Sequence, residues 1–177
     1  MTAMSEVVVP TESNKSPRAV VAKRGLPTVD AFLVLAALKD STMLSVLRAE
    51  MLKRGIAYSK RTLWNALHEL ANAGYVVHER GHYAPAPTVF PSPMRFLPLM
   101  NQGIAEVDLL LLVLSGVKHP KRTFFVLWGD AESTKRTYHD TMRRLVQLGY
   151  LERDHAWRYH PGKRVIALLE YNPEYTR

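Results

Sequence analysis

The sequence contains no cysteine. Disulfide bonds, zinc fingers and thiol catalysis are therefore excluded, and the composition is compatible with a reducing cytoplasm. Long hydrophobic runs are also missing, because the longest ones, Ala31–Leu38 and Leu109–Leu114, are far too short to span a bilayer. The N-terminus lacks a basic start followed by a continuous apolar core, which argues against a signal peptide. We therefore expect a cytoplasmic protein that does not enter a membrane.

Signatures of catalysis are missing as well. The chain shows no phosphate-cradling Gly loop, no nucleophile elbow and no clear pair of carboxylates. The string His78-Glu79-Arg80-Gly81-His82 matches the His-Glu-x-x-His pattern of zinc proteases. That chemistry needs both histidines one turn apart on a helix, whereas this string follows a β-prone segment and carries Gly at an expected hairpin tip. We expect a protein that is not an enzyme and has no metal and no cofactor.

What the chain does have is apolar bulk and positive charge. Hydrophobic residues make up 47% of the 177 residues, which is enough for packed cores, and the formal net charge is +8. A basic balance of this kind favours polyanionic partners, with nucleic acid first and an anionic membrane surface second.

The chain also repeats itself. Residues 59–76 and 134–151 align at an offset of 75 residues without a gap, and Lys, Arg, Thr, Leu, Gly and Tyr coincide at six of the eighteen positions. Upstream, Val29-Asp30 matches Val107-Asp108, each at the start of an apolar run. A long period that occurs twice indicates one domain plan used in tandem.

The repeat divides the chain into a flexible basic arm at 1–26, a first domain at 27–87, a linker at 88–105 and a second domain at 106–177. The linker is rich in proline and carries large apolar side chains. We expect it to pack on one of the domains. The alternative is that residues 88–100 form a surface for self-association or for a partner protein.

In the first domain the pattern predicts three helices and a β-hairpin. The predicted helices are 29–38, 43–54 and 59–73, and the predicted strands are 75–77 and 82–84. Asp40-Ser41-Thr42 offers an N-cap for the second helix and Ser59 one for the third, while Gly55 and Gly74 supply stops.

In the second domain the pattern predicts a similar order of helices and strands. Its expected helices are 107–114, 121–128 and a third one capped by Ser133 or Thr134. Strands are expected at 150–153 and, as a closing strand rich in Val, Ile and Leu, at 163–169.

Three helices followed by a hairpin, with Leu-x-x-x-Gly-Tyr at the join, resemble the winged helix-turn-helix family. The join reads Leu70 to Tyr75 in the first copy and Leu145 to Tyr150 in the second. The resemblance covers both copies. It implies a mostly α fold with small β-hairpins (α+β), made of two winged helix-turn-helix domains in tandem. It also implies that each third helix enters the major groove of DNA while the wing lies along the backbone.

The third helices carry the expected contacts. In the first copy a core stripe at Leu63, Leu67 and Leu70 leaves a polar face half a turn away, on which Arg61 can pair with guanine and Asn65 with adenine. The candidate DNA-binding residues of the two third helices are Ser59, Lys60, Arg61, Trp64, Asn65 and His68, and Thr134, Lys135, Arg136, His139 and Arg143.

Cations expected in the first turn of these helices are not explained by an ordinary solvated face. Lys60-Arg61 and Lys135-Arg136 are expected there, where each positive charge opposes the helix dipole at a cost of about 0.3–1 kcal/mol. Such a placement makes sense if the helix start meets phosphate or base edges.

Further contacts with the DNA backbone or the minor groove are expected from the wings and from the start of the second helix of the second copy. These candidates are Arg80 and His82, Arg153, Arg158, Lys163 and Arg164, and Lys121 and Arg122. We expect the aromatic residues Tyr75, Tyr83, Tyr150 and Trp157 to pack in the core or the hairpins and not to stack on bases.

The sequence thus predicts sequence-specific binding of double-stranded DNA, with a nucleoid-associated transcriptional regulator as the leading hypothesis. A plasmid- or phage-type replication initiator is the alternative, followed by a partition protein. The alternative of another class is a tandem winged-helix scaffold that grips proteins, and the apolar linker favours it.

Overall fold

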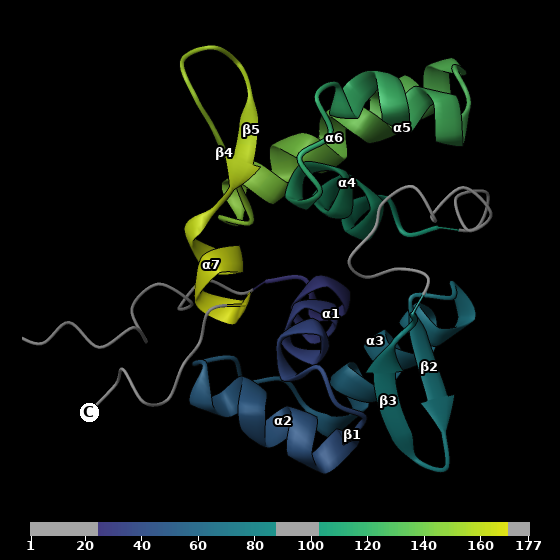
Figure 1. Cartoon of the computed structure of the whole chain (residues 1–177), viewed down its shortest axis with the longest axis vertical. Helices are drawn as coiled ribbons and strands as arrows, with labels where there is room; N and C mark the ends of the chain where they lie inside the picture. The colour runs from purple at the N-terminus through teal and green to yellow at the C-terminus, as the bar shows by residue number, and fades with distance from the viewer. Residues whose placement is uncertain (1–24, 88–102, 170–177) are drawn as a thin grey trace, which may run out of the picture.

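A computed structural model of the chain describes residues 25–87, which we call the first unit, and residues 103–169, the second unit. Figure 1 shows the first unit in the lower half of the molecule and the second in the upper half. Most of the expected arm (1–24) and linker (88–102), including the apolar surface expected at 88–100, lies outside the described residues.

The first unit contains the predicted three helices and hairpin, with one additional strand. Its elements are α1 (Pro27–Leu38), β1 (Thr42–Met43), α2 (Leu44–Lys53), α3 (Lys60–Asn72), β2 (Val76–Glu79) and β3 (His82–Pro85). Ser59 caps α3 as predicted, because its side chain accepts a hydrogen bond of 3.0 Å from the backbone N–H of Thr62. The turn at Arg80-Gly81 joins β2 and β3.

The additional strand corrects the predicted start of the second helix. Thr42 and Met43 pair antiparallel with Tyr83 and His82, so that the sheet has the order β1-β3-β2. The segment from Asp40 to Thr42 therefore does not cap a helix, and α2 begins at Leu44 without a side-chain cap. Pairing with β3 keeps Thr42 and Met43 extended, so that the helix begins only at Leu44.

The second unit also follows the predicted order at first. Its elements are α4 (Ala105–Leu114), α5 (Pro120–Trp128), α6 (Glu132–Gln147), β4 (Leu151–Arg153), β5 (Tyr159–Pro161) and α7 (Lys163–Leu169). The hairpin is antiparallel, and in the described residues it has two strands, β4 and β5.

The prediction of a closing strand at 163–169 is wrong, because these residues form α7. The β-branched Val165 and Ile166 favour a strand locally. In the fold, however, Arg164, Val165 and Leu168 are buried while Ile166 is exposed, a helical spacing and not an alternating one. Packing of α7 against α1 overrides the local propensity, and β5 takes the place of the closing strand.

The predicted cap of the third helix of the second unit is also wrong. Helix α6 begins at Glu132, with Ala131 as the N-cap and no side-chain cap. The side chain of Thr134 is buried and donates to the carbonyl of Trp128 at 3.4 Å. Lys135 and Arg136 are therefore the fourth and fifth residues of α6, whereas Lys60 and Arg61 are the first two residues of α3.

The buried side chains form a single cluster that continues from one unit into the other. Helices α1 and α4 are apolar on nearly every side, and each is buried along most of its length. Each helix has one buried acidic side chain, which is Asp30 in α1 and Asp108 in α4. The described part of the chain is thus mostly helical with small antiparallel sheets, which confirms the α+β class.

In the two described ranges, every helix is too short or too polar to cross a membrane.

Candidate nucleic-acid interface and the joint between the units

Helix α3 presents the face that the sequence predicted. Leu63, Ala66, Leu67 and Leu70 are buried in the core. The opposite side exposes the other predicted contacts of this helix, Ser59, Lys60, Arg61, Trp64, Asn65 and His68. Within the described ranges neither cation of the first turn has an acidic partner, and the first turn itself contains no acidic residue. Two positive charges therefore remain at the start of the helix, where the helix dipole disfavours them.

An aromatic pair continues this face along the next turn. The rings of Trp64 and His68 are stacked, with centroids 5.2 Å apart, and Trp64 is 49% exposed. Asn65 and His68 line a shallow hollow of about 530 Å³, together with Gly103 and Ile104 from the start of the second unit. The open, cationic part of α3 is therefore its N-terminal turn.

Helix α6 offers a weaker version of the same face. Arg136, His139 and Arg143 are exposed as predicted. Lys135, however, lies 3.6 Å from Asp130 and 4.0 Å from Glu132, and Arg143 lies 4.0 Å from Asp140. Neighbouring carboxylates offset part of the positive charge of this helix.

The two hairpin tips carry the predicted wing cations in different ways. In the first unit Arg80 is exposed at the β2–β3 turn with φ of 48°, and His82, half-buried, contacts the carbonyl of Arg80 through Nδ1 at 3.2 Å. In the second unit Arg153 stacks over the ring of Trp157 at 3.9 Å, and Arg158 pairs with Asp154 at 2.9 Å. Hydrogen bonds from His160 and from the backbone of Arg158 hold the pKa of the Asp154 carboxyl well below its usual range.

Trp157 packs in the hairpin, which is one of its two expected places, because Arg153 lies over its ring, but it is 70% exposed. Tyr75, Tyr83 and Tyr150 are buried as predicted.

Two predicted contacts with DNA lie inside the molecule and cannot reach it. Thr134 is buried beneath the start of α6. Arg164 has a side chain that is 3% exposed and forms an ion pair with Asp30 of the first unit. The prediction for both residues is therefore wrong, whereas Lys163, next to Arg164, is exposed. Lys121, Arg122 and Arg158 are exposed and line a cleft between α5 and the β4–β5 hairpin.

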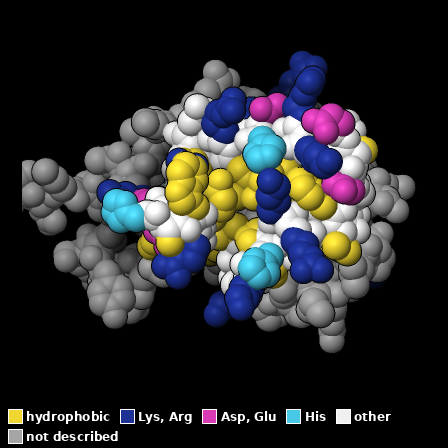
Figure 2. Space-filling model, turned by 90° about the horizontal axis from the view of Figure 1, so that it is seen from above, with side chains coloured by type: hydrophobic (Ala, Val, Ile, Leu, Met, Phe, Trp, Pro, Cys, Tyr) yellow, Lys and Arg dark blue, Asp and Glu magenta, His cyan; other side chains and the backbone are white. Residues whose placement is uncertain are grey.

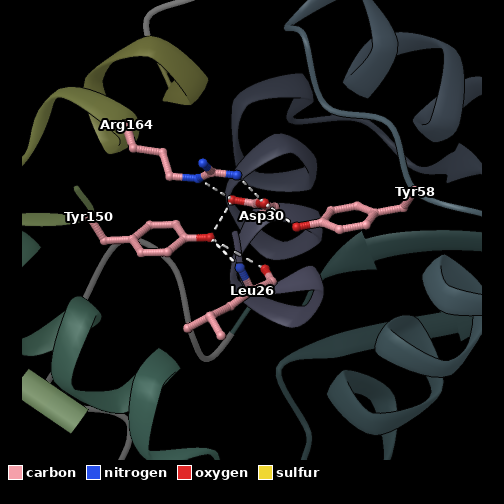
Figure 3. A network of polar contacts seen from close by, with 5 residues as sticks. All are labelled: Leu26, Asp30, Tyr58, Tyr150 and Arg164. Carbon is pink, nitrogen blue, oxygen red and sulfur yellow. Dashed lines mark hydrogen bonds and ion pairs between the residues drawn. The ribbon is translucent and has the colours of Figure 1, made fainter. Parts of the chain in front are cut away.

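Asp30 is the centre of a polar network that joins the units (Figure 3). Its Oδ1 accepts hydrogen bonds from the hydroxyl of Tyr150 at 2.6 Å and from Nε of Arg164 at 2.9 Å. Its Oδ2 accepts from Nη2 of Arg164 at 2.6 Å and from the hydroxyl of Tyr58 at 2.7 Å. The backbone N–H of Leu26 donates to the hydroxyl of Tyr150 at 2.8 Å.

Asp108 is the centre of the corresponding network in the second unit, to which the first unit contributes a tyrosine. The hydroxyl of Tyr75, from the first unit, donates to Asp108 Oδ1, and Nε1 of Trp128 donates to Oδ2 at 2.8 Å. The backbone N–H of Ile104 donates to the hydroxyl of Tyr75 at 2.9 Å. The tyrosine of each Gly-Tyr join thus reaches the first turn of the long apolar helix of the other unit.

A glycine before each of these helices makes the approach possible. A Cβ at Gly25 would lie 2.1 Å from Nη2 of Arg164, and a Cβ at Gly103 would lie 2.3 Å from Oδ2 of Asp108. Both glycines stand five residues before the aspartate of their helix. Gly25 and Gly103 are therefore related by the same offset as Asp30 and Asp108. The sequence analysis used only the repeated Val-Asp pair and did not predict the joint.

The two networks differ in charge. Arg164 neutralises Asp30, and no cation takes that place beside Asp108 among its described partners. Burial raises the pKa of Asp108 to about 6, although the hydrogen bonds from Tyr75 and Trp128 oppose the shift. Burial would lower the pKa of Arg164, but the hydrogen bonds and charge of Asp30 raise it above its ordinary value.

In the described residues, His, Asp and Glu side chains do not gather into a group that could hold a metal ion. The His78–His82 string lies on the β2–β3 hairpin, where His78 stacks on Tyr83. Comparison with known protein families, with curated proteins and with solved structures yields no match to this chain.

Proposed function

We propose that this protein binds double-stranded DNA in a sequence-specific manner, as a transcriptional regulator built from two winged-helix units in tandem. The observation that carries the proposal is the first turn of α3, where Lys60 and Arg61 are exposed without an acidic partner in the described part of the chain. Cations in this position cost stability and become favourable when the helix start meets phosphate or base edges.

The rest of the first unit fits this role. The core stripe fixes α3 so that Asn65 lies on the same exposed side as Arg61. Arg can pair with guanine and Asn with adenine in the major groove. The β2–β3 hairpin would place Arg80 along the DNA backbone in the manner of a wing.

The second unit would add a second, different half-site. Arg136 on α6 would correspond to Arg61 on α3, but α6 has Asp140 and Arg143 where α3 has Asn65 and His68. The joint formed by Asp30 and Asp108 would hold the two units in a fixed relation, so one chain could act as a covalent pseudo-dimer. The selected DNA site would distinguish regulation of a promoter from a role at a replication origin or a partition site.

The test is fluorescence anisotropy with a random 30-base-pair duplex, titrated across salt. The full chain should bind with a log–log slope against salt of about −4 or more negative, because several phosphate contacts release counterions. The Arg61→Glu/Arg136→Glu variant should lose about tenfold or more in affinity while it melts at the wild-type temperature. Retained binding by this folded variant would refute the assignment of the interface, and no binding of the wild type at low salt would refute the function.

A further inference from the structure

The second unit contains a cleft of about 1560 Å³ between α5 and the β4–β5 hairpin. One wall comes from the connection 115–119 and from α5, and the other from the hairpin turn and β5. Figure 2 views this end of the molecule and shows hydrophobic side chains in the middle, with Lys, Arg and His side chains around them and acidic side chains toward one side. The cleft is larger and more open than pockets that enclose a small ligand.

Comparison of the units shows what the cleft replaces. In the first unit the connection 39–43 contains β1, which pairs with the outer edge of β3. The equally long connection 115–119 of the second unit lines the cleft, and within the described residues β5 pairs only with β4. The hairpin residues that line the cleft lie in the turn and in β5, and none lies in β4. The free edge of β5 therefore borders the cleft where a third strand would lie.

The floor and sides of the cleft are apolar and uncovered. Phe125 and Val117 lie against the core, while Val126 and Trp157 are 74% and 70% exposed. Apolar side chains at this exposure, beside an open strand edge, suit a polypeptide, whose own side chains can cover them. Duplex DNA presents phosphates and base edges and has no apolar surface of that shape to offer.

The charged side chains that line the cleft indicate the charge of its partner. Lys118, Lys121 and Arg122 have no acidic partner in the described part of the chain, although Lys121 lies 5.8 Å from the ring centre of Phe125. The one carboxylate in the lining, Asp130, is already paired with Lys135 at 3.6 Å. An acidic partner would supply the missing negative charge.

We propose that this cleft binds an extended, acidic peptide segment of a partner protein, which adds to β5 as the third strand of the sheet. Alternate apolar side chains of the peptide cover Val126 and Trp157, and its Asp or Glu residues meet Lys118, Lys121 and Arg122. Because Pro161 has no backbone N–H, β5 offers few backbone hydrogen bonds. Side-chain contacts and charge therefore contribute most of the affinity. This site acts independently of the proposed DNA contacts of α3.

The test is a selection of phage-displayed random dodecapeptides on the full chain. Peptides in which acidic and apolar residues alternate should be enriched, and a fluorescent copy should bind at physiological salt. Lys121→Glu/Arg122→Glu and, separately, Val126→Arg should each weaken it about tenfold or more. Arg61→Glu should leave it unchanged. A proline in the middle of the peptide should weaken binding, and bound peptide should slow hydrogen exchange of the Tyr159 amide, which faces the free edge of β5.

Both variants change exposed side chains, so thermal melting checks that they fold. Failure of the selection to enrich acidic peptides would overturn the proposal, as would equal binding of the enriched peptides to Lys121→Glu/Arg122→Glu. If that variant loses duplex binding as strongly as Arg61→Glu and keeps peptide binding, the cleft belongs to the DNA surface and the proposal is wrong. Loss of DNA binding in Arg61→Glu with intact peptide binding separates the two functions.

Discussion

The two units share a joint and differ in almost everything that surrounds it. Each buries a Gly-Tyr tyrosine against the aspartate of the other unit's apolar helix. The first unit closes its sheet edge with β1 and receives Arg164 for its aspartate, while the second leaves β5 open and Asp108 without a cation among its described partners. The repeat therefore fixes the core and the contact between units, and leaves the outer surfaces free to take different partners.

The largest expected effect comes from removal of the cation that only the first aspartate has. Arg164→Met should lower the free energy of unfolding by about 3–5 kcal/mol, because it leaves the carboxylate of Asp30 buried without its countercharge. Urea denaturation measures the loss. Arg143→Ala, which removes an exposed cation from α6, should stay within about 0.5 kcal/mol of wild type. A loss below 1 kcal/mol for Arg164→Met would show that the buried pair does not hold α7 on α1.

The next effect is a dependence on pH that belongs to the second unit. Because the folded pKa of Asp108 is raised to about 6, the folded state binds its proton more tightly than the unfolded chain. The stability that this proton contributes is complete below the unfolded pKa of about 3.8 and is lost as pH rises through about 6.

Comparison with Asp108→Asn isolates this contribution. The stability of wild type relative to the variant should fall by up to about 3 kcal/mol between pH 4 and pH 7.5. Denaturant titrations across this range measure the difference. Parallel profiles for the two proteins would contradict the description of Asp108 as a desolvated carboxylate.

The symmetry of the joint predicts a smaller, matched pair of effects. Tyr75→Phe and Tyr150→Phe each remove a hydroxyl that donates to a buried carboxylate and accepts from a backbone N–H. Each should cost about 1–3 kcal/mol, because one buried acceptor and one buried donor lose a partner. Loss of stability in only one of the two variants would break the equivalence of the networks.

Much of this fold follows from local signals. Ser59 and Gly74 delimit α3 correctly, and the apolar stripe places Arg61 and Asn65 outside. Asp30 and Asp108, and Tyr75 and Tyr150, stand at repeated positions. Their pairing across units could not be predicted, because a repeat shows which residues are equivalent and does not show which ones touch.

The wrong predictions share a physical cause. Strand β1 exists because β3 offers it an edge, and α7 is helical because α1 offers it an apolar surface and Asp30. In each case a partner distant in the sequence outweighs local propensity. The burial of Arg164 has the same cause. A cation near a hairpin is expected at the surface unless its buried partner, here the distant Asp30, is known.

The smallest change in stability is expected from charge reversals that compare the start of α3 with the start of α6. Lys60→Glu replaces a cation in the first turn with an anion and should raise the free energy of unfolding by about 0.3–1 kcal/mol. Lys135→Glu changes the fourth residue of α6, where it also removes the contacts with Asp130 and Glu132, and should give no gain. Thermal melting of both variants measures this difference. An equal gain in both would remove the distinction between the helices.

The central claim, that the first turn of α3 binds DNA, is tested most directly by duplex binding of Arg61→Glu beside Lys39→Glu. Both reversals change the net charge equally, and Lys39 is exposed at the end of α1. We predict that Arg61→Glu loses about tenfold or more in affinity at low salt and has a shallower salt slope, whereas Lys39→Glu loses only a few-fold. Equal losses in the two variants, both folded, would show that the net charge and not the α3 turn attracts DNA, and would contradict the account.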